Sequence, residues 1–205
     1  MFYIGLDLGQ RQDHTAIVIV ERRDLRRGYQ ARVFDQLLVR WVERVALGTP
    51  YPMVVERVRS FAQHWELAGR CAVVMDGTGV GAPVVEMMWR AELGCEITAV
   101  TITGGDRESR SGGGRISVPK RDLIAGVQLA LEKGELKIAK QMRETGALVR
   151  ELLQMRVTAG LALGKVRIGA DGAGEHDDLA LALALACWRA KRPRIGFQEN
   201  RLPGI

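Results

Sequence analysis

The chain has 205 residues, of which 47% are hydrophobic and 26% charged, with a net charge of +6. This size and balance are typical of one globular domain with a sizeable core, and the positive charge permits an anionic partner. The N-terminus has no basic segment and meets an aspartate at its seventh residue, and no apolar run approaches the roughly 18 residues of a membrane span. A signal peptide and a membrane protein are excluded, and we expect a cytoplasmic protein.

The first half of the chain predicts three strands followed by alternating helices and strands. Apolar, β-branched runs indicate strands at residues 2–9, 14–23 and 31–44, the first two joined as a hairpin. Beyond them, apolar residues at helical spacing indicate helices, and short apolar runs indicate strands. The expected order is a helix at 53–69, a strand at 71–76, a helix at 82–93 and a strand at 96–102.

The second half predicts a loop and then mostly helices. Residues Gly104–Arg115 are rich in glycine, serine and arginine and have no hydrophobic anchor, so we expect a mobile loop. The later pattern indicates a helix at 119–134, a short strand at 135–139, a helix at 142–156, a hairpin at 161–169 and a final helix beginning near residue 177. This order predicts an α/β domain with a mixed sheet, its first three strands antiparallel and its later strands parallel. We assign the domain to residues 1–192 and expect residues 193–205 to form a tail.

Acidic residues stand at three ends of the predicted elements. Asp7 interrupts the first apolar strand, and Asp76 ends the strand at 71–76. Asp177 and Asp178 come directly before Leu179–Trp188, an uncharged and almost wholly apolar run that predicts a helix buried on every side. Local roles explain each acid separately, because aspartate is common in turns and caps helix N-termini.

Taken together, the acids favour a metal site. In open α/β sheets functional groups gather at the carboxyl ends of strands, and a helix N-terminus can reach the same edge. Several carboxylates without paired cations suit hard divalent ions such as Mg²⁺ or Mn²⁺. Two such ions about 4 Å apart hydrolyse phosphodiesters by activating water and stabilising the leaving oxygen. The residues therefore predict a metal-dependent phosphoryl-transfer enzyme that acts on nucleic acid.

A basic, glycine-containing segment at residues 103–121 would hold a polyanionic backbone beside such a site. We expect phosphate contacts from five of its side chains: Arg107, Arg110, Arg115, Lys120 and Arg121. A second basic group lies at residues 189–201. A solvated surface explains either group equally well.

Four segments come in the same order as in the C-terminal nuclease domain of phage terminase large subunits: YIGLDLGQRQDHTAIVIVE, VVMDGTGVGAPVVEMM, VPKRDLIAGVQLALEKGELKIA and GEHDDLALALALA. The chain resembles that family over nearly its whole length, and DGTGVG followed by HDDLALALA is the most specific part. The resemblance implies an RNase H-like fold with helices on both faces of the sheet, and a two-metal endonuclease that cuts double-stranded DNA during genome packaging. It also implies a phage-infected or prophage-carrying bacterial cell, and the terminase ATPase domain, small terminase subunit and portal as partners.

The family's catalytic, metal-binding carboxylates fall, by motif, on Asp7, Asp76 and the pair Asp177 and Asp178. The resemblance favours Asp178 within the pair, because this residue directly precedes the apolar run, as in the resolvases. Glu175, one helical turn earlier, is then an auxiliary metal ligand.

One feature of complete terminase large subunits is missing, because the chain has no GxxxxGK[ST] phosphate loop. We expect an excised nuclease domain or a stand-alone relative that neither hydrolyses ATP nor moves DNA by itself. Three alternatives stay open: a RuvC-like Holliday junction resolvase, a non-catalytic DNA-binding module, and an actin-like phosphotransferase, for which 205 residues are too few. His176 either positions substrate or caps the last helix, and His14 is expected in a solvent-facing turn.

Overall fold

The structure is a computed structural model that describes residues 1–9, 13–27, 32–78, 81–111, 115–159, 166–169 and 177–192. Its main sheet consists of β1 (Phe2–Asp7), β2 (Ala16–Arg27), β3 (Arg32–Arg44), β4 (Cys71–Asp76), β5 (Glu96–Thr103), β6 (Ser109–Ser111), β7 (Arg115–Pro119) and β8 (Leu136–Ile138). The helices are α1 (Tyr51–Ala62), α2 (Gly81–Arg90), α3 (Lys120–Glu132), α4 (Thr145–Gln154) and α5 (Asp178–Ala190). A separate antiparallel hairpin is formed by β9 (Arg156–Ala159) and β10 (Val166–Gly169).

The strand order in the main sheet is β6-β7-β5-β4-β1-β2-β3-β8, which places β1 near the centre. β1, β2 and β3 pair antiparallel, whereas β1, β4, β5 and β7 are parallel neighbours in turn. This arrangement confirms the predicted mixed sheet with an antiparallel beginning. The carboxyl ends of the four parallel strands meet at one edge, which we call the carboxyl edge.

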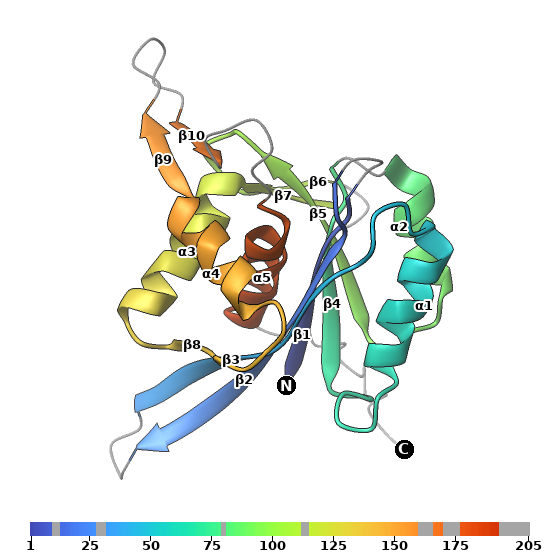
Figure 1. The fold of residues 1–205 in the computed structure, drawn as a ribbon, viewed down its shortest axis with the longest axis horizontal. Helices are drawn as coiled ribbons and strands as arrows, with labels where there is room; N and C mark the ends of the chain where they lie inside the picture. The colour runs from blue at the N-terminus through green and yellow to red at the C-terminus, as the bar shows by residue number, and fades with distance from the viewer. Residues whose placement is uncertain are drawn as a thin grey trace, which may run out of the picture.

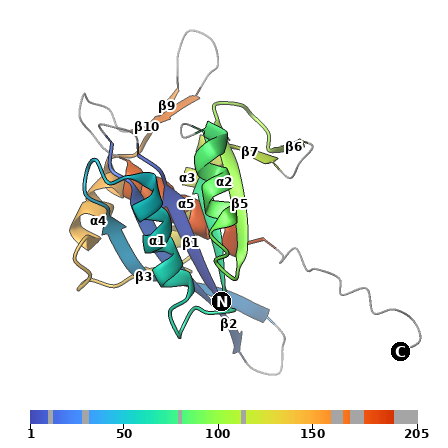
Figure 2. The same ribbon diagram turned by 90° about the vertical axis from the view of Figure 1, so that its right-hand side faces the viewer.

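Helices cover both faces of the sheet (Figures 1 and 2). α1 and α2 pack on one face, and α3, α4 and α5 lie on the other. The strands supply a hydrophobic surface to each side because successive side chains of a strand point to opposite faces. In β1, Ile4 and Leu6 join the core under α1 and α2, and Tyr3 joins the core around α5.

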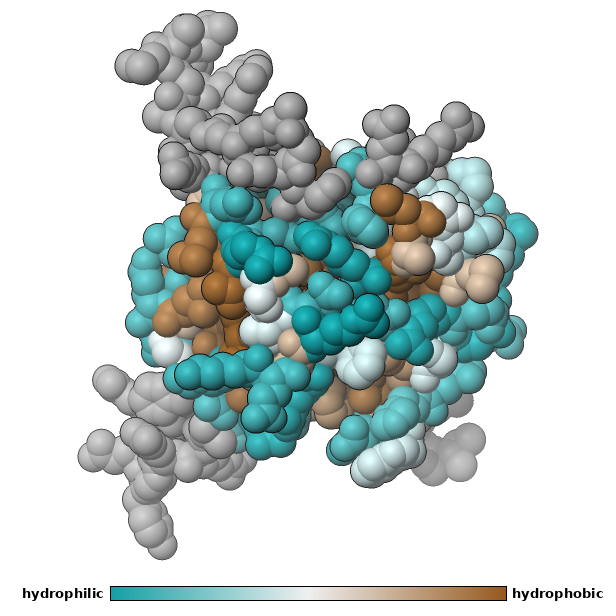
Figure 3. All heavy atoms as spheres, in the orientation of Figure 1, coloured by the Kyte–Doolittle hydropathy of each residue, from teal (hydrophilic) through white to brown (hydrophobic). Residues whose placement is uncertain are grey.

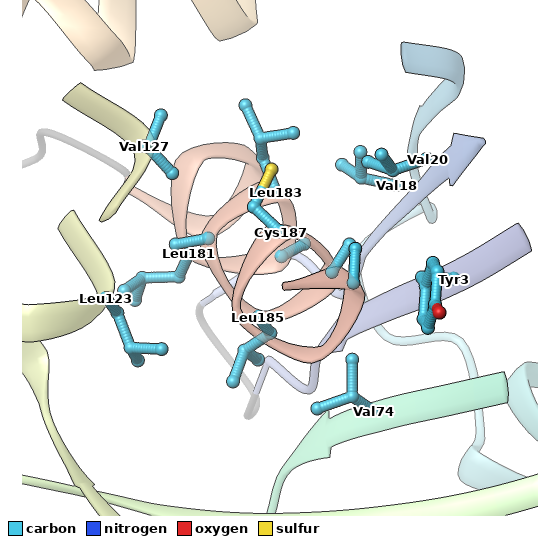
Figure 4. Close-up of a cluster of buried hydrophobic side chains, with 14 of the residues drawn as sticks. Tyr3, Val18, Val20, Val74, Leu123, Val127, Leu181, Leu183, Leu185 and Cys187 are labelled. Carbon is cyan, nitrogen blue, oxygen red and sulfur yellow. The ribbon is translucent and has the colours of Figure 1, made fainter. Parts of the chain in front are cut away.

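α5 is the centre of the larger core (Figure 4). Its leucines lie between Tyr3, Val18 and Val74 of the sheet and the apolar residues of α3. Leu183 and Leu185 are fully buried. The prediction of a helix buried on every side is confirmed, and its packing fixes where the acidic start of α5 lies.

Part of the predicted loop at Gly104–Arg115 is strand, which corrects the sequence interpretation. Ser109–Ser111 form β6 and pair with β7, which begins at Arg115. Pairing at the edge of a sheet uses backbone amides and carbonyls, so it needs no apolar side chain and leaves no hydrophobic pattern. Residues 112–114 lie outside the described residues.

Further boundaries differ from the prediction. α1 ends at Ala62, whereas the sequence suggested a helix up to residue 69, and β2 continues to Arg27, beyond the predicted end at residue 23. α4 ends at Gln154, and Arg156 already begins β9, whereas the sequence suggested a helix up to residue 156. The hairpin therefore runs from residues 156–159 to residues 166–169 and not across 161–169. Its connection at residues 160–165 and the predicted tail at 193–205 lie outside the described residues.

The surface in the view of Figure 1 mixes hydrophilic areas with separate hydrophobic patches (Figure 3). Within the described segments, no helix is long and apolar enough to cross a membrane.

The sequence predicted a solvent-facing side chain for His14, but the structure shows a half-buried one. Its Nδ1 lies 3.0 Å from the carbonyl oxygen of Val45.

Candidate active site

Asp7 and Asp76 end two neighbouring parallel strands at the carboxyl edge. The register of β1 with β4 pairs Leu6 with Met75, and each aspartate is the next residue of its strand. Neighbouring strands lie about 4.8 Å apart, so the two carboxylates extend from adjacent backbone positions. Both point to the face that carries α5, because Val74, two residues before Asp76, belongs to the core around α5, and β1 alternates in the same register.

A glycine brings the start of α5 to the same place. A Cβ atom at Gly5 would lie 1.9 Å from the carbonyl oxygen of Ala182, so only a residue without a side chain allows this contact. Ala182 lies one helical turn beyond Asp178, the first residue of α5. The close contact between β1 and α5 therefore holds Asp178 and the preceding Asp177 over the end of β1.

Burial and repulsion act together on Asp7. Its pKa lies well above the ordinary value, first because burial disfavours the charged form, and then because Asp76, Asp177 and Asp178 add negative charge around it. Lys120 acts in the opposite direction. The structure thus brings together the four aspartates that the sequence singled out, although their roles as metal ligands stay predictions.

The side chain of Asp177 does not cap α5. Asp177 occupies the N-cap position, but its carboxylate makes no capping hydrogen bond and forms an ion pair with Lys120. Asp178 accepts a hydrogen bond from Nε of Arg44 at 3.1 Å. Helix capping, the simplest explanation for these two acids, therefore does not account for their side chains.

Asp76 does have the turn role that its sequence context suggests. Its Oδ1 accepts the backbone N–H of Thr78 at 2.8 Å and also the Thr78 hydroxyl. The Thr78 oxygen in turn accepts the N–H of Ile102 at 2.7 Å, which ties the turn to β5. These bonds fix the position of Asp76 at the carboxyl edge.

Two residues of the site, Glu151 and Arg44, were not found from the sequence. Glu151 of α4 is 4% exposed and accepts the N–H of Ala180 at 2.9 Å, and its other oxygen binds the guanidinium of Arg44. Burial raises the pKa of Glu151 to about 7, although the Ala180 N–H and Arg44 favour its charged form. One signal was available, because Glu151 lies one turn after Ala147 on the buried face of α4, where an acid is unexpected.

The chemistry of the site suits divalent cations. Among the described residues, no three His, Cys, Asp or Glu side chains are arranged to hold an ion together as they stand. Acids nevertheless outnumber the bases that contact them: Asp7, Asp76, Asp177, Asp178 and Glu151 against Lys120 and Arg44. Carboxylate oxygens are the preferred ligands of Mg²⁺ and Mn²⁺, which would offset this excess charge.

The predicted DNA-contacting residues lie around the carboxyl edge on the β7 side. Lys120 begins α3 and contacts Asp177, so it belongs to the acidic site itself. Arg107 and Arg110 are exposed, and Arg121 forms an ion pair with Asp106 at 2.7 Å. Arg115 is placed at the start of β7 by its backbone. DNA binding by these residues stays a prediction.

The predicted auxiliary ligand Glu175 and the neighbouring His176 lie outside the described residues. Their roles remain predictions.

Comparison with solved structures agrees with the resemblance seen in the sequence. No protein-family profile and no curated protein sequence matches the chain. The nuclease domain of the large terminase subunit gp2 of bacterial virus Sf6, in a variant with manganese and beta-thujaplicinol, is similar with a TM-score of 0.57 and 19% identity. That match covers 91% of this chain and 87% of the other.

A second solved structure is the nuclease domain of the large terminase g2p from bacteriophage SPP1 with bound manganese. It is similar with a TM-score of 0.53 and 12% identity over 92% of this chain and 85% of the other. At these identities the comparison establishes the fold. The chain has the RNase H-like fold found in the nuclease domains of phage large terminase subunits.

Proposed function

We propose that the chain is a metal-dependent endonuclease that hydrolyses phosphodiester bonds of DNA. The observation that carries this proposal is the surroundings of Asp7, a half-buried carboxyl group at a strand end whose pKa is raised by burial and by three further aspartates around it. Such an arrangement is costly for stability unless a cation binds there. Acids gathered at a cost to stability are typical of functional sites.

Asp7, Asp76 and Asp178 would hold Mg²⁺ or Mn²⁺, with Asp177 and Glu175 as further ligands. A pair of such ions supplies an activated water and a counter-charge for the leaving oxygen. Structures of the same fold from Sf6 and SPP1 contain manganese, which supports this choice of ion. Lys120, in contact with Asp177, is placed to balance charge beside a bound phosphate.

Double-stranded DNA is the proposed substrate. Arg107 and Arg110 are exposed near the carboxyl edge, and exposed arginines hold phosphates without reading base sequence. Because the fold is that of terminase nuclease domains, we also propose that the chain works with a terminase ATPase domain, a small terminase subunit and a portal. These partners would move the DNA. The given sequence has no GxxxxGK[ST] phosphate loop, so we do not expect it to drive this movement by hydrolysing ATP.

A plasmid-nicking assay tests the proposal. The protein is incubated with supercoiled plasmid in Mn²⁺, in Mg²⁺ and in EDTA, beside the variants Asp7→Asn and Glu86→Gln. Asp7→Asn removes one acid of the site, whereas Glu86 is an exposed acid of α2 on the opposite face. We expect nicking in either metal, none in EDTA, a loss of at least about 100-fold in Asp7→Asn and no change in Glu86→Gln.

Two other outcomes would point to the alternatives. DNA binding that is indifferent to metal and to Asp7→Asn, without nicking, would indicate a DNA-binding module. Cleavage confined to synthetic four-way junctions, with linear duplex and plasmid left intact, would indicate a junction resolvase.

A further inference from the structure

Glu151 takes the place of a capping side chain at the start of α5. In most helices the side chain of the N-cap residue accepts the N–H of the second or third helical residue. Asp177 holds the N-cap position of α5 but makes no such bond. The N–H of Ala180, the third helical residue, is instead donated to Oε2 of Glu151 at 2.9 Å.

Arg44 extends this contact to the acidic site. Its Nη2 donates to the second oxygen of Glu151, and its Nε donates to Asp178 at 3.1 Å. Arg44 also lies in one row of the sheet with Asp7, because Ala16 of β2 pairs with Asp7 on one side and with Arg44 on the other. The link from Glu151 to the helix therefore stands at the same edge as the proposed metal ligands.

We propose that Glu151 is a positioning residue, which caps α5 from a neighbouring helix and thereby leaves Asp177 and Asp178 for metal ions. This inference rests on the proposed function. When Asp178 turns to a metal ion, Arg44 keeps Glu151 as its partner, so a half-buried cation is not left unpaired. Without Glu151, the Ala180 N–H loses its acceptor, and the N-cap residue Asp177 is the side chain placed to replace it.

Two substitutions at the same position separate capping from charge. Glu151→Gln and Glu151→Met both remove the negative charge and have similar length, but only glutamine has an oxygen that can accept the Ala180 N–H. Mn²⁺ binding by the complete chain is measured by titration calorimetry, and thermal unfolding confirms that each variant is folded. We expect Glu151→Met to weaken Mn²⁺ binding about tenfold and Glu151→Gln to restore most of that loss. Equal Mn²⁺ affinities for the two variants would overturn the proposal.

A double-mutant cycle gives a second readout. Asp177→Ala is made in the wild type and in Glu151→Met, and Mn²⁺ affinity is measured in all four proteins. If Asp177 replaces the lost cap, it is already withdrawn from the metal in Glu151→Met, so its removal costs less there than in the wild type. Equal costs in the two backgrounds would contradict the proposal.

The variant Asp7→Asn distinguishes failure of this inference from failure of the proposed function. If the wild type shows no Mn²⁺ binding that depends on Asp7, the proposed function is overturned and this inference with it. If that binding is present and Glu151→Met leaves it intact, only the role of Glu151 is overturned.

Discussion

Gly5 and Ala182 bring β1 and α5 into backbone contact, and a Cβ atom at Gly5 would lie 1.9 Å from the Ala182 carbonyl oxygen. Gly5→Ala must therefore push α5 away from β1, and with it Asp178 away from Asp7. We expect Gly5→Ala to lower the free energy of unfolding by about 3 kcal/mol and to weaken Mn²⁺ binding. Urea unfolding and metal titration measure the two effects.

Gly126→Ala is the matched control for that prediction. Gly126 lies in α3, and a Cβ atom built there meets nothing within 4 Å. Because alanine favours helix more than glycine does, the free energy of unfolding of this variant should rise by up to about 1 kcal/mol, and its affinity for Mn²⁺ should stay unchanged. Similar stability of the two variants would show that the contact between β1 and α5 is more yielding than the structure indicates.

Asp7 should destabilise the metal-free protein at neutral pH. Its pKa in the folded state lies above the ordinary value of 3.8, so its contribution to stability is complete below about pH 3.8 and is lost as the pH rises through the folded-state pKa. In EDTA at pH 8, Asp7→Asn should therefore melt at a higher temperature than the wild type. In excess Mn²⁺ the order should reverse, because only the wild type gains the full binding energy. A lower melting temperature for Asp7→Asn in EDTA would contradict this account.

The raised pKa of Glu151 predicts a second pH dependence of the protein's stability. Its pKa rises from 4.5 to about 7 on folding, so the stability that it contributes is complete below about pH 4.5 and is lost as the pH rises through 7. The loss is of order 3 kcal/mol in the metal-free protein. Glu151→Gln cannot titrate, so its unfolding free energy in EDTA should change less than that of the wild type between pH 4.5 and 7.5. Parallel pH profiles of the two proteins would show that Glu151 does not titrate in this range.

Replacing Arg107, Arg110 and Arg115 with alanine should weaken DNA binding on all sequences. Each lost phosphate contact should reduce the slope of log affinity against log salt concentration by about 1. Fluorescence anisotropy with two unrelated duplexes at several salt concentrations measures this slope. Mn²⁺ affinity should stay near the wild-type value, because the acids lie on strand ends and on α5.

A control with the same change in net charge uses Arg70, Arg90 and Lys133. These exposed residues precede β4, end α2 and follow α3, which places them at the opposite end of the sheet from the carboxyl edge. Their replacement by alanine should leave the salt slope almost unchanged. If both triple variants lose the same affinity, net charge and not a local DNA track explains the binding.

The acids at element ends could be predicted from the sequence because each one interrupts or borders an apolar run. Asp7 stands in a strand that is otherwise buried, and Asp178 begins a helix with no polar face. Packing alone does not select acids at such places, so their type and position pointed to one edge of the sheet. The fold class followed from the same strand and helix pattern.

Glu151, Arg44 and β6 could not be predicted in the same way. The roles of Glu151 and Arg44 depend on which elements meet in space, since the residues they contact are distant in the chain. β6 pairs through its backbone at the sheet edge, and its short serine and arginine sequence shows no strand pattern. Sequence periodicity reports burial, whereas these features arise from long-range pairing.

α5 comes after all the other described elements in sequence, yet it packs at the centre of the larger core, against β1 and β2. A nascent chain therefore cannot close this core, or bring Asp178 beside Asp7, until residues up to Ala190 have left the ribosome. In the proposed function, an incomplete chain lacks part of its catalytic acids and is unable to cut the DNA of the cell that makes it.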